Sequence, residues 1–472
     1  MSRVLMVASE AMPFAKTGGL GDVVGALPEA LVSLGEEVAV LIPRYRGMPV
    51  NGASRAYTGL PVWVGHHQWT AHILSLTRNG VLYYFLDCPA LYDRDGLYGS
   101  ENGDFPDNHV RYAVLCRAAL SVVRHLWRPD IIHCHDWQAA LAPVYMRQFF
   151  AMDPTFLALK ALFTIHNLGY QGKFPPSILP EVGLDGALYR PDGLEHFGEV
   201  NLMKGAILYS EAISTVSPTY AREIQGEEFG FGLQDILRAR SASVHGILNG
   251  VDYSVWSPEA DSMIACRYSA ADLSGKAACK QDLLAEMGLP QENMSRPLIG
   301  IISRFVNQKG FDLIAAAMRE IMSLDVAMAV LGTGEPSYEQ MFRDAAAAHP
   351  DRIACYIGYS EPLAHKIEAG ADMFLMPSWY EPCGLNQMYS LRYGTVPVVR
   401  ATGGLHDSVD ETTGFKFFEY SADALLEALR AAVGVYNQPD VWRAMMLRGM
   451  AKDFSWSASA ARYADLYRSL LP

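Results

Sequence analysis

Several features that would place this chain outside the soluble globular proteins are missing from its sequence. No apolar stretch reaches the ~18 residues that a membrane-spanning helix needs, and no low-complexity tract or long charge run indicates disorder. The N-terminus runs from Met1 straight into an apolar strand pattern, without the basic region, apolar core and cleavage site of a signal peptide. We therefore expect a globular, cytoplasmic protein with no membrane partner.

Cysteine pairs and positive charge are also scarce. The seven cysteines are scattered with no C-x-x-C pair, which is typical of reduced thiols in the cytosol. Lysine and arginine number 38 against 51 acidic residues, so the formal net charge is −13. Nucleic-acid-binding proteins normally carry a basic face or stripe, and we expect no nucleic-acid partner. An acidic chain can still bind phosphate where a few basic residues and helix N-termini converge.

Length and hydrophobic pattern predict two large domains. The 472 residues amount to about three usual single-domain lengths, and half of them are hydrophobic. Short apolar runs alternate with amphipathic segments, and the alternation starts afresh after residues 249–252. The predicted strands are Val4–Ser9, Val38–Pro43, Asp130–His135, Leu162–His166, Ile213–Val216, Leu298–Ser303, Val326–Leu331, Ile353–Ile357, Met373–Pro377 and Val396–Val399. The predicted helices are Val23–Leu34, Val110–Trp127, Trp137–Phe149, Gly310–Met322, Pro336–Ala348, Leu363–Ala369 and Leu385–Tyr393.

This alternation predicts an α/β chain with two doubly wound domains, each a parallel sheet covered by helices on both faces. Val62–Gly65 and Val81–Asp87 indicate a small antiparallel excursion in the first half. In such sheets ligands bind beyond the carboxyl ends of the strands. The informative residues should therefore lie just after strands.

A glycine-rich loop, Lys16 to Asp22, follows the first predicted strand and opens a helix. Glycines let a backbone approach a pyrophosphate closely, and a helix N-terminus favours negative charge. The spacing matches neither G-x-G-x-x-G nor the P-loop. A plain strand-to-helix turn with Lys16 exposed explains the same residues, so both interpretations stay open.

Polar residues follow two further strands of the first half. His133, His135 and Asp136 end one strand, and His166 and Asn167 follow the next. A metal site at the first cluster has no second group with ligand spacing to complete it, and Asp136 as a helix cap is a simpler alternative. We favour contact with a substrate there. A lone histidine such as His166 is often only a hydrogen-bonded core residue.

In the second half, Arg304 and Lys309 lie between a strand and a helix, where they suit a diphosphate. Surface charges flanking a helix start are the alternative. Further on, Glu381 precedes a Pro-Cys-Gly turn at a helix N-terminus, which suits a ligand with hydroxyls and a phosphate on one edge. Cys383 has no evident partner for nucleophilic or redox chemistry. Thr402-Gly403-Gly404-Leu405 forms a second such turn.

Two other sugar chemistries fit less well. A glycosidase needs two carboxyl groups, about 5–5.5 Å apart in retaining enzymes; Asp136 and Glu381 could be members, but the phosphate-binding loops would then be unexplained. Asp93-Arg94-Asp95 has the D-x-D form of a metal motif in single-domain sugar transferases. The two-domain pattern argues against that fold.

Taken together, these stretches resemble the bacterial glycogen synthase and plant starch synthase family, and they span nearly the whole chain. The shared motifs are K-T-G-G-L-G-D-V at 16–23, H-D-W at 135–137, T-I-H-N-L at 164–168, L-N-G-V-D at 248–252, S-R-F…Q-K-G at 303–310, E-P-C-G-L at 381–385 and T-G-G-L at 402–405. The resemblance implies a GT-B fold, with two Rossmann-like domains facing across a deep cleft and a C-terminal helix crossing back. The implied domains are 1–247 on the acceptor side, 248–455 for the nucleotide sugar, and 456–472 as the returning helix.

The resemblance also implies the reaction, namely retaining transfer of glucose from ADP-glucose to the non-reducing end of an α-1,4-glucan, without cofactor or metal. Arg304 and Lys309 would bind the diphosphate, Glu381 would hold glucose hydroxyls, His166 would contact the transferred glucose, and Asp136 would support the sugar or acceptor. Tyr359 is a candidate for stacking on adenine. The other implied substrate-binding residues are Lys16, Gly18, Gly19, Asp22, Asn167, Asn249, Cys383, Gly384, Leu385, Thr402 and Gly403.

Retention would ordinarily require an enzymic nucleophile, and none is evident. The family expectation is front-face substitution, in which the departing phosphate accepts the acceptor's proton. Related retaining enzymes carry a second Glu eight positions after the first, and Tyr389 stands there in this chain. A paired-carboxylate mechanism is therefore disfavoured.

Two alternatives to this function remain. One is a UDP-glucose-dependent transferase of the same fold, and the other is a catalytically silent glucan-binding protein. The second would be expected to lose Arg304, Lys309 or Glu381, and all three are present. Four aromatic residues of the first half are candidate glucan contacts or ordinary core residues, namely Trp63, Trp69, Tyr92 and Tyr98.

Overall fold

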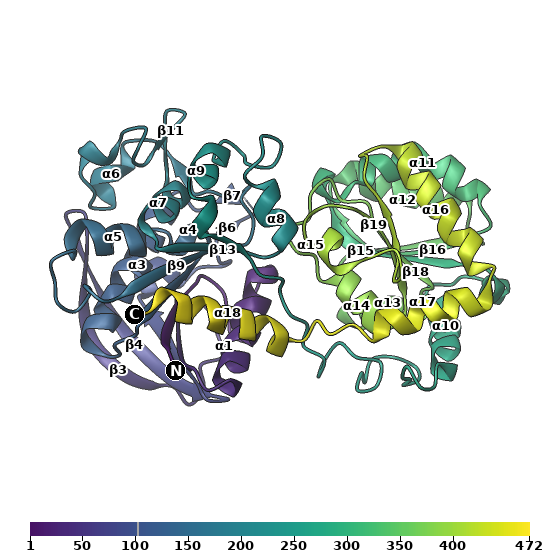
Figure 1. The fold of residues 1–472 in the computed structure, drawn as a ribbon, viewed down its shortest axis with the longest axis horizontal. Helices are drawn as coiled ribbons and strands as arrows, with labels where there is room; N and C mark the ends of the chain where they lie inside the picture. Colours follow the sequence, from purple (N-terminus) through teal and green to yellow (C-terminus); the bar gives the residue numbers. More distant parts are fainter. Residues whose placement is uncertain (102) are drawn as a thin grey trace. The chain divides into compact units, whose positions relative to one another are not determined.

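The computed structural model describes residues 1–101 and 103–472, and the chain forms two compact units (Figure 1). Unit 1 consists of Met1–Val216, Ala221–Gly250 and Trp456–Pro472, and unit 2 consists of Ser217–Tyr220 and Val251–Ser455. The chain leaves unit 1 after Gly250, close to the boundary expected at 247, and returns to it at Trp456. The short excursion of residues 217–220 into unit 2 was not expected from the sequence.

Unit 1 is built on a nine-stranded sheet in the order β14-β13-β9-β8-β1-β2-β5-β4-β3. Its strands are β1 Arg3–Val7, β2 Glu37–Pro43, β3 Ser54–Val64, β4 His67–Arg78, β5 Val81–Asp87, β8 Ile131–His135, β9 Lys160–Ile165, β13 Ala212–Thr215 and β14 Val244–Gly246. All pairs from β14 through to β5 are parallel, whereas β4 is antiparallel to both its neighbours. Smaller pairings involve β6 Gly99–Ser100 with β7 Gly103–Asp104, and β12 Glu199–Asn201 with β10 Lys173–Phe174 and β11 Glu195–His196.

Helices cover both faces of this sheet. The helices of unit 1 are α1 Gly19–Ser33, α2 Pro89–Tyr92, α3 Asn108–His125, α4 Asp136–Ala139, α5 Leu141–Phe149, α6 Ile178–Glu181, α7 Leu202–Tyr209, α9 Gln234–Ala239 and α18 Trp456–Leu470, and α8 Pro218–Glu223 has residues in both units. α18 packs against α1, and both share one core with Val4 and Met6 of β1 (Figure 1). Leu5 and Val7, which point to the opposite face, are also fully buried. The returning C-terminal segment is thus part of the fold of unit 1.

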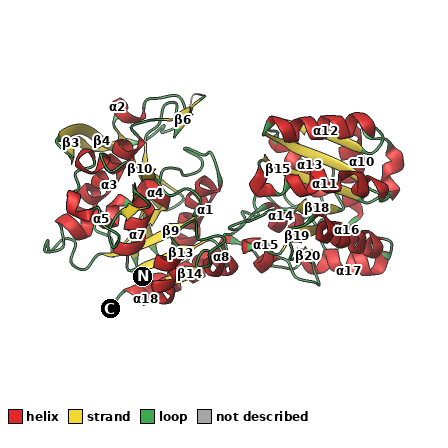
Figure 2. Ribbon diagram, turned by 90° about the horizontal axis from the view of Figure 1, so that it is seen from above, coloured by secondary structure: helices red, strands yellow, loops and turns green. Residues whose placement is uncertain are grey.

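Unit 2 contains a six-stranded, all-parallel sheet in the order β17-β16-β15-β18-β19-β20 (Figure 2). Its strands are β15 Leu298–Phe305, β16 Ala327–Gly334, β17 Ile353–Ile357, β18 Met373–Met376, β19 Val396–Arg400 and β20 Phe415–Phe417. Its helices are α10 Ser274–Glu286, α11 Phe311–Ser323, α12 Pro336–Ala348, α13 Glu361–Gly370, α14 Asn386–Arg392, α15 Gly403–Ser408, α16 Ala422–Tyr436 and α17 Pro439–Met450. Alternate residues of β16 enter two cores: Met328 and Val330 pack with α11, α12 and α16, while Ala329 and Leu331 pack with α10 and α13. This is a doubly wound fold, as the sequence predicted.

Two local predictions were wrong. The antiparallel excursion is larger than expected, because β3 and β4 form an extended hairpin on the edge of the main sheet, and β5 pairs parallel with β2 on its other side. β4 escaped detection because it exposes many polar side chains and lacks a continuous apolar run. The helix predicted over residues 137–149 is divided into α4 and α5.

In the part of the chain that the model describes, no helix is long and apolar enough to span a bilayer.

Candidate active site

The glycine-rich loop of unit 1 joins β1 to α1 and is held from behind by a buried carboxylate. Glu10 accepts hydrogen bonds from the Thr17 amide at 2.5 Å, the Thr17 hydroxyl at 2.7 Å, the Gly18 amide at 3.2 Å and the Tyr98 phenol. In front of the loop, a Cβ built on Gly18 or Gly19 would meet nothing within 4 Å. The loop therefore presents an open backbone face at the start of α1.

This arrangement gives one backbone amide a different role from the one expected. The Gly18 amide, predicted to face a phosphate, donates to Glu10 in this structure. Lys16 ends 2.6 Å from Asp22 in the first turn of α1, which joins two of the predicted residues in an exposed ion pair. Gly25 is required one turn later, since a Cβ there would lie 2.7 Å from the Met12 side chain.

A column of buried histidines crosses the centre of the same sheet. His133 and His135 project from β8 and are fully buried. His133 Nδ1 lies 2.9 Å from the hydroxyl of Tyr467 on α18, and its Nε2 lies 2.6 Å from the Thr164 hydroxyl. His135 Nδ1 lies 3.1 Å from His166 Nε2 at the end of β9. Burial lowers the pKa of His133 and of His166 to about 3, so both rings are neutral near pH 7.

Asp136 supports His166 rather than its own helix. It adopts a φ of 55°, uncommon for a residue other than glycine, and its Oδ1 accepts a hydrogen bond of 2.8 Å from the His166 amide. The interpretation of Asp136 as a helix cap is therefore wrong. Burial raises the pKa of its carboxyl to about 7, against a lowering by the backbone hydrogen bonds of His166 and Asn167. A carboxyl that titrates near neutral pH is typical of a group with a functional role.

Two asparagines complete the predicted set in unit 1. Asn167 closes a turn by accepting from the Gly169 amide at 2.9 Å. Asn249 follows β14 and is buried, and no described residue donates a hydrogen bond to its Oδ1. A buried amide oxygen without a donor is costly, so Asn249 is suited to receive a ligand hydroxyl. Among the described residues, no group of three or more His, Cys, Asp or Glu side chains is arranged to hold a metal ion.

In unit 2 the structure joins two predicted residues directly. Lys309 Nζ lies 2.6 Å from Glu381 Oε2, and the Ser378 hydroxyl lies 3.2 Å from the same oxygen. Lys309 is placed by Gly310, which has a φ of 75° and lies so close to Pro377 that a Cβ would approach its carbonyl oxygen to 2.1 Å. Arg304, at the end of β15, is exposed and pairs with no described carboxylate. A guanidinium without a described carboxylate partner is suited to bind a phosphate group.

The Glu381–Leu385 turn is clamped by its own helix. Gln387 of α14 donates to the carbonyls of Cys383 at 3.0 Å and Gly384 at 3.1 Å. Because the C=O and N–H of one peptide point in opposite directions, the amides of Gly384 and Leu385 point away from Gln387. At the N-terminal end of α14, an anionic or hydroxyl group can accept from such amides.

The second glycine turn packs behind the first. A Cβ on Gly403 would lie 1.9 Å from the Glu381 carbonyl oxygen, and one on Gly404 would lie 2.0 Å from that of Cys383. The Gly404 amide donates to the Glu381 carbonyl at 3.1 Å. The Thr402–Leu405 turn therefore supports the Glu381 turn, and only glycine fits at these contacts.

The remaining candidates differ in exposure. Tyr359, just after β17, is 81% exposed, as a stacking platform requires. Of the four aromatic residues proposed for glucan contact, Tyr92 is fully buried and is a core residue, whereas Trp63 is 55% exposed. Asp93 and Asp95 of the D-x-D triplet both bind Arg46, at 2.8 and 2.9 Å.

Sequence reasoning missed Glu10 and Gln387. Glu10 lies just beyond β1, so the search for polar residues after strands would have found it had it been applied there. Gln387 carries no such signal, because its importance depends on the rotamer that brings its amide back onto the preceding turn.

Comparison with known proteins agrees with this geometry. The model of the starch synthase catalytic domain family matches residues 3–239, and that of glycosyl transferases group 1 matches residues 288–443. A glycogen synthase of Koribacter versatilis (strain Ellin345) is 48% identical, with 98% of this chain and 97% of that protein covered. A glycogen synthase of Anaeromyxobacter dehalogenans (strain 2CP-C) is 47% identical over the full length of both.

Solved structures agree as well. The catalytic domain of starch synthase IV from Arabidopsis thaliana, bound to ADP and acarbose, superposes with a TM-score of 0.90 at 34% identity, covering 99% of each chain. A sucrose-phosphate synthase from Thermosynechococcus elongatus gives a TM-score of 0.62 at 18% identity, with 100% of this chain and 99% of that one covered, and shares the fold only.

Proposed function

Since this chain belongs to the family of bacterial glycogen synthases and starch synthases, we propose that it transfers glucose from ADP-glucose to the non-reducing end of an α-1,4-glucan, with retention of configuration. It is a glycosyltransferase with the GT-B fold. The observation that carries the proposed chemistry is the Lys309–Glu381 pair beside the clamped turn before α14. The ADP bound by the starch synthase IV structure supports an adenine nucleotide as the donor.

The donor's diphosphate is assigned to Arg304 and Lys309. Arg304 has no described carboxylate partner to displace, and Lys309 can share its charge between Glu381 and a phosphate oxygen. Two fixed cations would stabilise the charge that develops on ADP as the glycosidic bond breaks. Lys16 and the Gly19 amide are the assigned phosphate-side groups of unit 1, and Asp22, paired with Lys16, is a further substrate-binding residue. Gly18 would have to exchange its bond to Glu10 to join them.

The glucosyl group is assigned to the turn before α14. Glu381 would accept hydrogen bonds from sugar hydroxyls, while the amides of Cys383, Gly384 and Leu385 donate. Thr402 and Gly403 support that turn from behind. Tyr359 would stack on adenine.

In unit 1, His166 is assigned to the reacting sugar. Its neutral ring is held by His135, and its amide is held by Asp136. We assign the His166 carbonyl to stabilise the oxocarbenium-like centre, and Asp136 to a hydroxyl of the sugar or acceptor. Asn167 and Asn249 supply further polar contacts, the latter through its unpaired Oδ1.

Retention is assigned to front-face substitution. The acceptor hydroxyl attacks from the side that the phosphate leaves, the C1–O bond to ADP breaks, and the departing phosphate takes the hydroxyl proton. Tyr389, at the position of the second carboxylate in related enzymes, stacks on Trp256 at 4.1 Å with parallel rings. It is held as a packing residue, which supports a mechanism with one carboxylate at this turn.

We further propose that the reaction needs neither cofactor nor metal, because Arg304 and Lys309 supply the positive charge that a divalent cation would otherwise provide. Full activity after EDTA treatment and buffer exchange would support this, and restoration by Mg²⁺ of activity lost to EDTA would contradict it. A cytoplasmic location is proposed from the seven cysteines, all free thiols in the structure.

The function is tested by incorporation of radiolabelled glucose into glycogen, with ADP-glucose and UDP-glucose in parallel. We expect label from ADP-glucose to enter a polymer, and we expect amylase to release that label again. Lys309→Ala should lower incorporation by about 100-fold or more, whereas Lys366→Ala, which removes a lysine of α13 paired with Glu286 of α10 at 2.7 Å, should not. Incorporation from UDP-glucose alone would establish the alternative donor. Glycogen binding without incorporation from either donor would leave a glucan-binding protein.

A further inference from the structure

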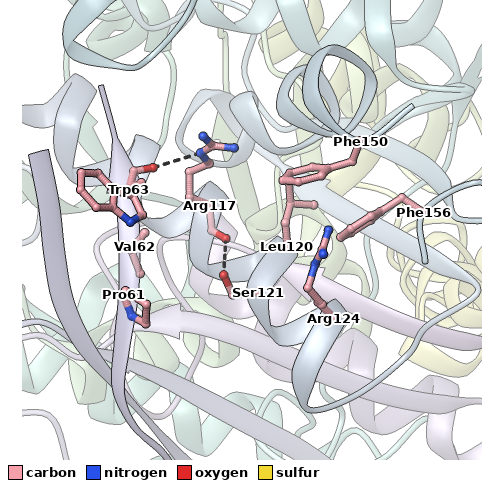
Figure 3. Close-up of a pocket in the computed structure, with 9 residues that line it drawn as sticks. All are labelled: Pro61, Val62, Trp63, Arg117, Leu120, Ser121, Arg124, Phe150 and Phe156. Atoms are coloured by element: carbon pink, nitrogen blue, oxygen red, sulfur yellow. Dashed lines mark hydrogen bonds between the residues drawn. The ribbon is translucent and has the colours of Figure 1, made fainter. Parts of the chain in front are cut away.

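Unit 1 contains a pocket that the proposed reaction does not use. It lies between strand β3, helix α3 and the segment after α5, and has a volume of about 190 Å³ (Figure 3). Its lining residues are Pro61, Val62, Trp63, Arg117, Leu120, Ser121, Arg124, Phe150 and Phe156. The first turn of α3 lies near the glycine-rich loop, because Asn108 binds the carbonyl of Tyr98. At 1.5 Å per residue, Arg117 and Arg124 are about 14 and 24 Å farther along the helix.

Two guanidinium groups line this pocket in a chain of net charge −13. They are seven residues apart and project from the same face of α3. Arg124 is paired with Asp153. Arg117 has no described carboxylate partner: its Nε donates to the Trp63 carbonyl at 3.1 Å, and no described residue accepts from its terminal nitrogens. Burial lowers the pKa of Arg117, so one positive charge is partly desolvated without a counter-charge.

Aromatic rings hold both guanidinium groups in place. The Arg117 guanidinium lies 4.7 Å from the ring centre of Tyr145 and 4.8 Å from that of Phe149. The Arg124 guanidinium lies 5.2 Å from Phe150 and 5.3 Å from Phe156. Stacking occupies the faces of a guanidinium but leaves its in-plane N–H groups able to donate. The terminal N–H groups of Arg117 are thus pre-oriented donors.

Apart from Ser121, the rest of the wall is apolar. Phe150 and Phe156 stack with ring centres 5.0 Å apart, and Trp63 leaves 55% of its surface exposed on the opposite side (Figure 3). A pocket of about 190 Å³ has room for one ring and one small head group.

From these contacts we propose that the pocket binds a small organic anion, whose phosphate or carboxylate head is held by Arg117 and Arg124. Its ring or apolar body lies between Trp63 and the Phe150–Phe156 pair. An anion supplies the counter-charge that Arg117 lacks, whereas a neutral sugar does not. This is a second ligand site, separate from the donor residues Arg304 and Lys309.

The test uses phenyl phosphate and phenylacetate as probes, titrated calorimetrically into the full-length protein at low salt. The Arg304→Ala/Lys309→Ala double variant serves as the host, so that the proposed donor site cannot hold the probe. We expect one or both anions to bind, and phenol, the neutral analogue, to bind at least about tenfold more weakly. Arg117→Gln should weaken the anion about tenfold or more, as loss of a charge-assisted hydrogen bond predicts.

Two further variants complete the test. Arg319→Gln, which removes an arginine 93% exposed and paired with Glu320, is the matched control and should leave the affinity unchanged. Trp63→Ala should weaken both anions through loss of the ring contact, and its exposed position avoids dependence on a core substitution. Thermal unfolding of each variant verifies that unit 1 is folded.

Four results would overturn the proposal. They are no binding of either anion, equal affinity of the host and its Arg117→Gln and Trp63→Ala variants, equal affinity for phenol and phenyl phosphate, and binding of maltotriose in place of the anions. The last would identify a glucan surface. The relative affinities for phenyl phosphate and phenylacetate show which anionic head group the two arginines select.

Discussion

The half-buried Asp136 lies against the His166 amide, and the pKa of about 7 for its carboxyl makes it the titrating group to examine first. The ionised form of Asp136 is the stronger acceptor for a sugar or acceptor hydroxyl. We therefore expect kcat/KM to rise with pH through about 7. Asp136→Asn should lower kcat/KM and remove this rise, as measured in initial-rate profiles from pH 5.5 to 8.5. A wild-type profile that is retained in the variant would contradict the assignment.

The same pKa has a consequence for stability. Because the folded-state pKa of Asp136 is raised above 3.8, the unfolded chain releases this proton at lower pH than the native protein does. The group therefore opposes folding increasingly as pH rises from about 4 to about 7, by up to roughly 4 kcal/mol. The Tm of Asp136→Asn relative to the wild type should increase over that range, which gives a second readout independent of activity.

Lys309 and Glu381 are assigned to different parts of the donor, the diphosphate and the glucose. Lys309→Ala should lower kcat/KM by about 100-fold or more, since it removes a cation placed at the leaving diphosphate. It should also weaken ADP, which lacks glucose. Glu381→Gln should lower kcat/KM to the same extent as Lys309→Ala. It should not lower the affinity for ADP, because it frees Lys309 to bind the phosphates. Calorimetric ADP affinities beside initial rates test both. Full turnover in either variant would remove that residue's assignment.

At the scale of single elements, the turn before α14 depends on α14 itself. Gln387→Leu removes the donors to the carbonyls of Cys383 and Gly384. Each lost buried hydrogen bond costs about 1–3 kcal/mol, and the turn should lose its fixed orientation. We expect kcat/KM for ADP-glucose to fall about 10- to 100-fold, on the scale of about 1.4 kcal/mol for each factor of ten. Gln340→Leu, which removes an exposed glutamine bound to Asp344 on α12, is the control. Equal rates for both variants would exclude this clamp.

Helix α18 contributes to the active-site side of unit 1 through one hydroxyl. Tyr467 is buried and binds His133 at 2.9 Å, at the base of the column that ends in His166. Tyr467→Phe should lower the free energy of unfolding by about 1–2 kcal/mol, because His133 Nδ1 loses its partner. ADP affinity should be unchanged, since the proposed ADP ligands of unit 2 are untouched. A variant as stable as the wild type would show that this hydrogen bond contributes nothing.

At the scale of the whole molecule, the sequence predicted the repeated pattern better than the contacts between its parts. The buried strands of both sheets are short, continuous apolar runs, so their existence followed from periodicity. The hydrogen bonds of Glu10 with Thr17 and Tyr98 depend on loops that periodicity does not position. Strand β4 is largely polar, and the helix over 137–149 divides at Ala140, so neither produced a distinct signal. Polar residues that follow strands could be predicted from their position in the sequence. Supporting residues such as Gln387 could be identified only from the structure.

The separate cores of the two units lead to the last prediction. Phe305, Phe311 and Phe342 belong to a core of unit 2, while Tyr463 and Tyr467 belong to one of unit 1. We expect differential scanning calorimetry to show two transitions. ADP at about 100 times its Kd should stabilise unit 2 by about 2.7 kcal/mol, raising the Tm of one transition by roughly 5–11 °C for a unit of this size. Tyr467→Phe should lower the other transition, and Lys309→Ala should diminish the ADP shift. A single transition that responds to both changes would mean that the two cores unfold as one cooperative unit.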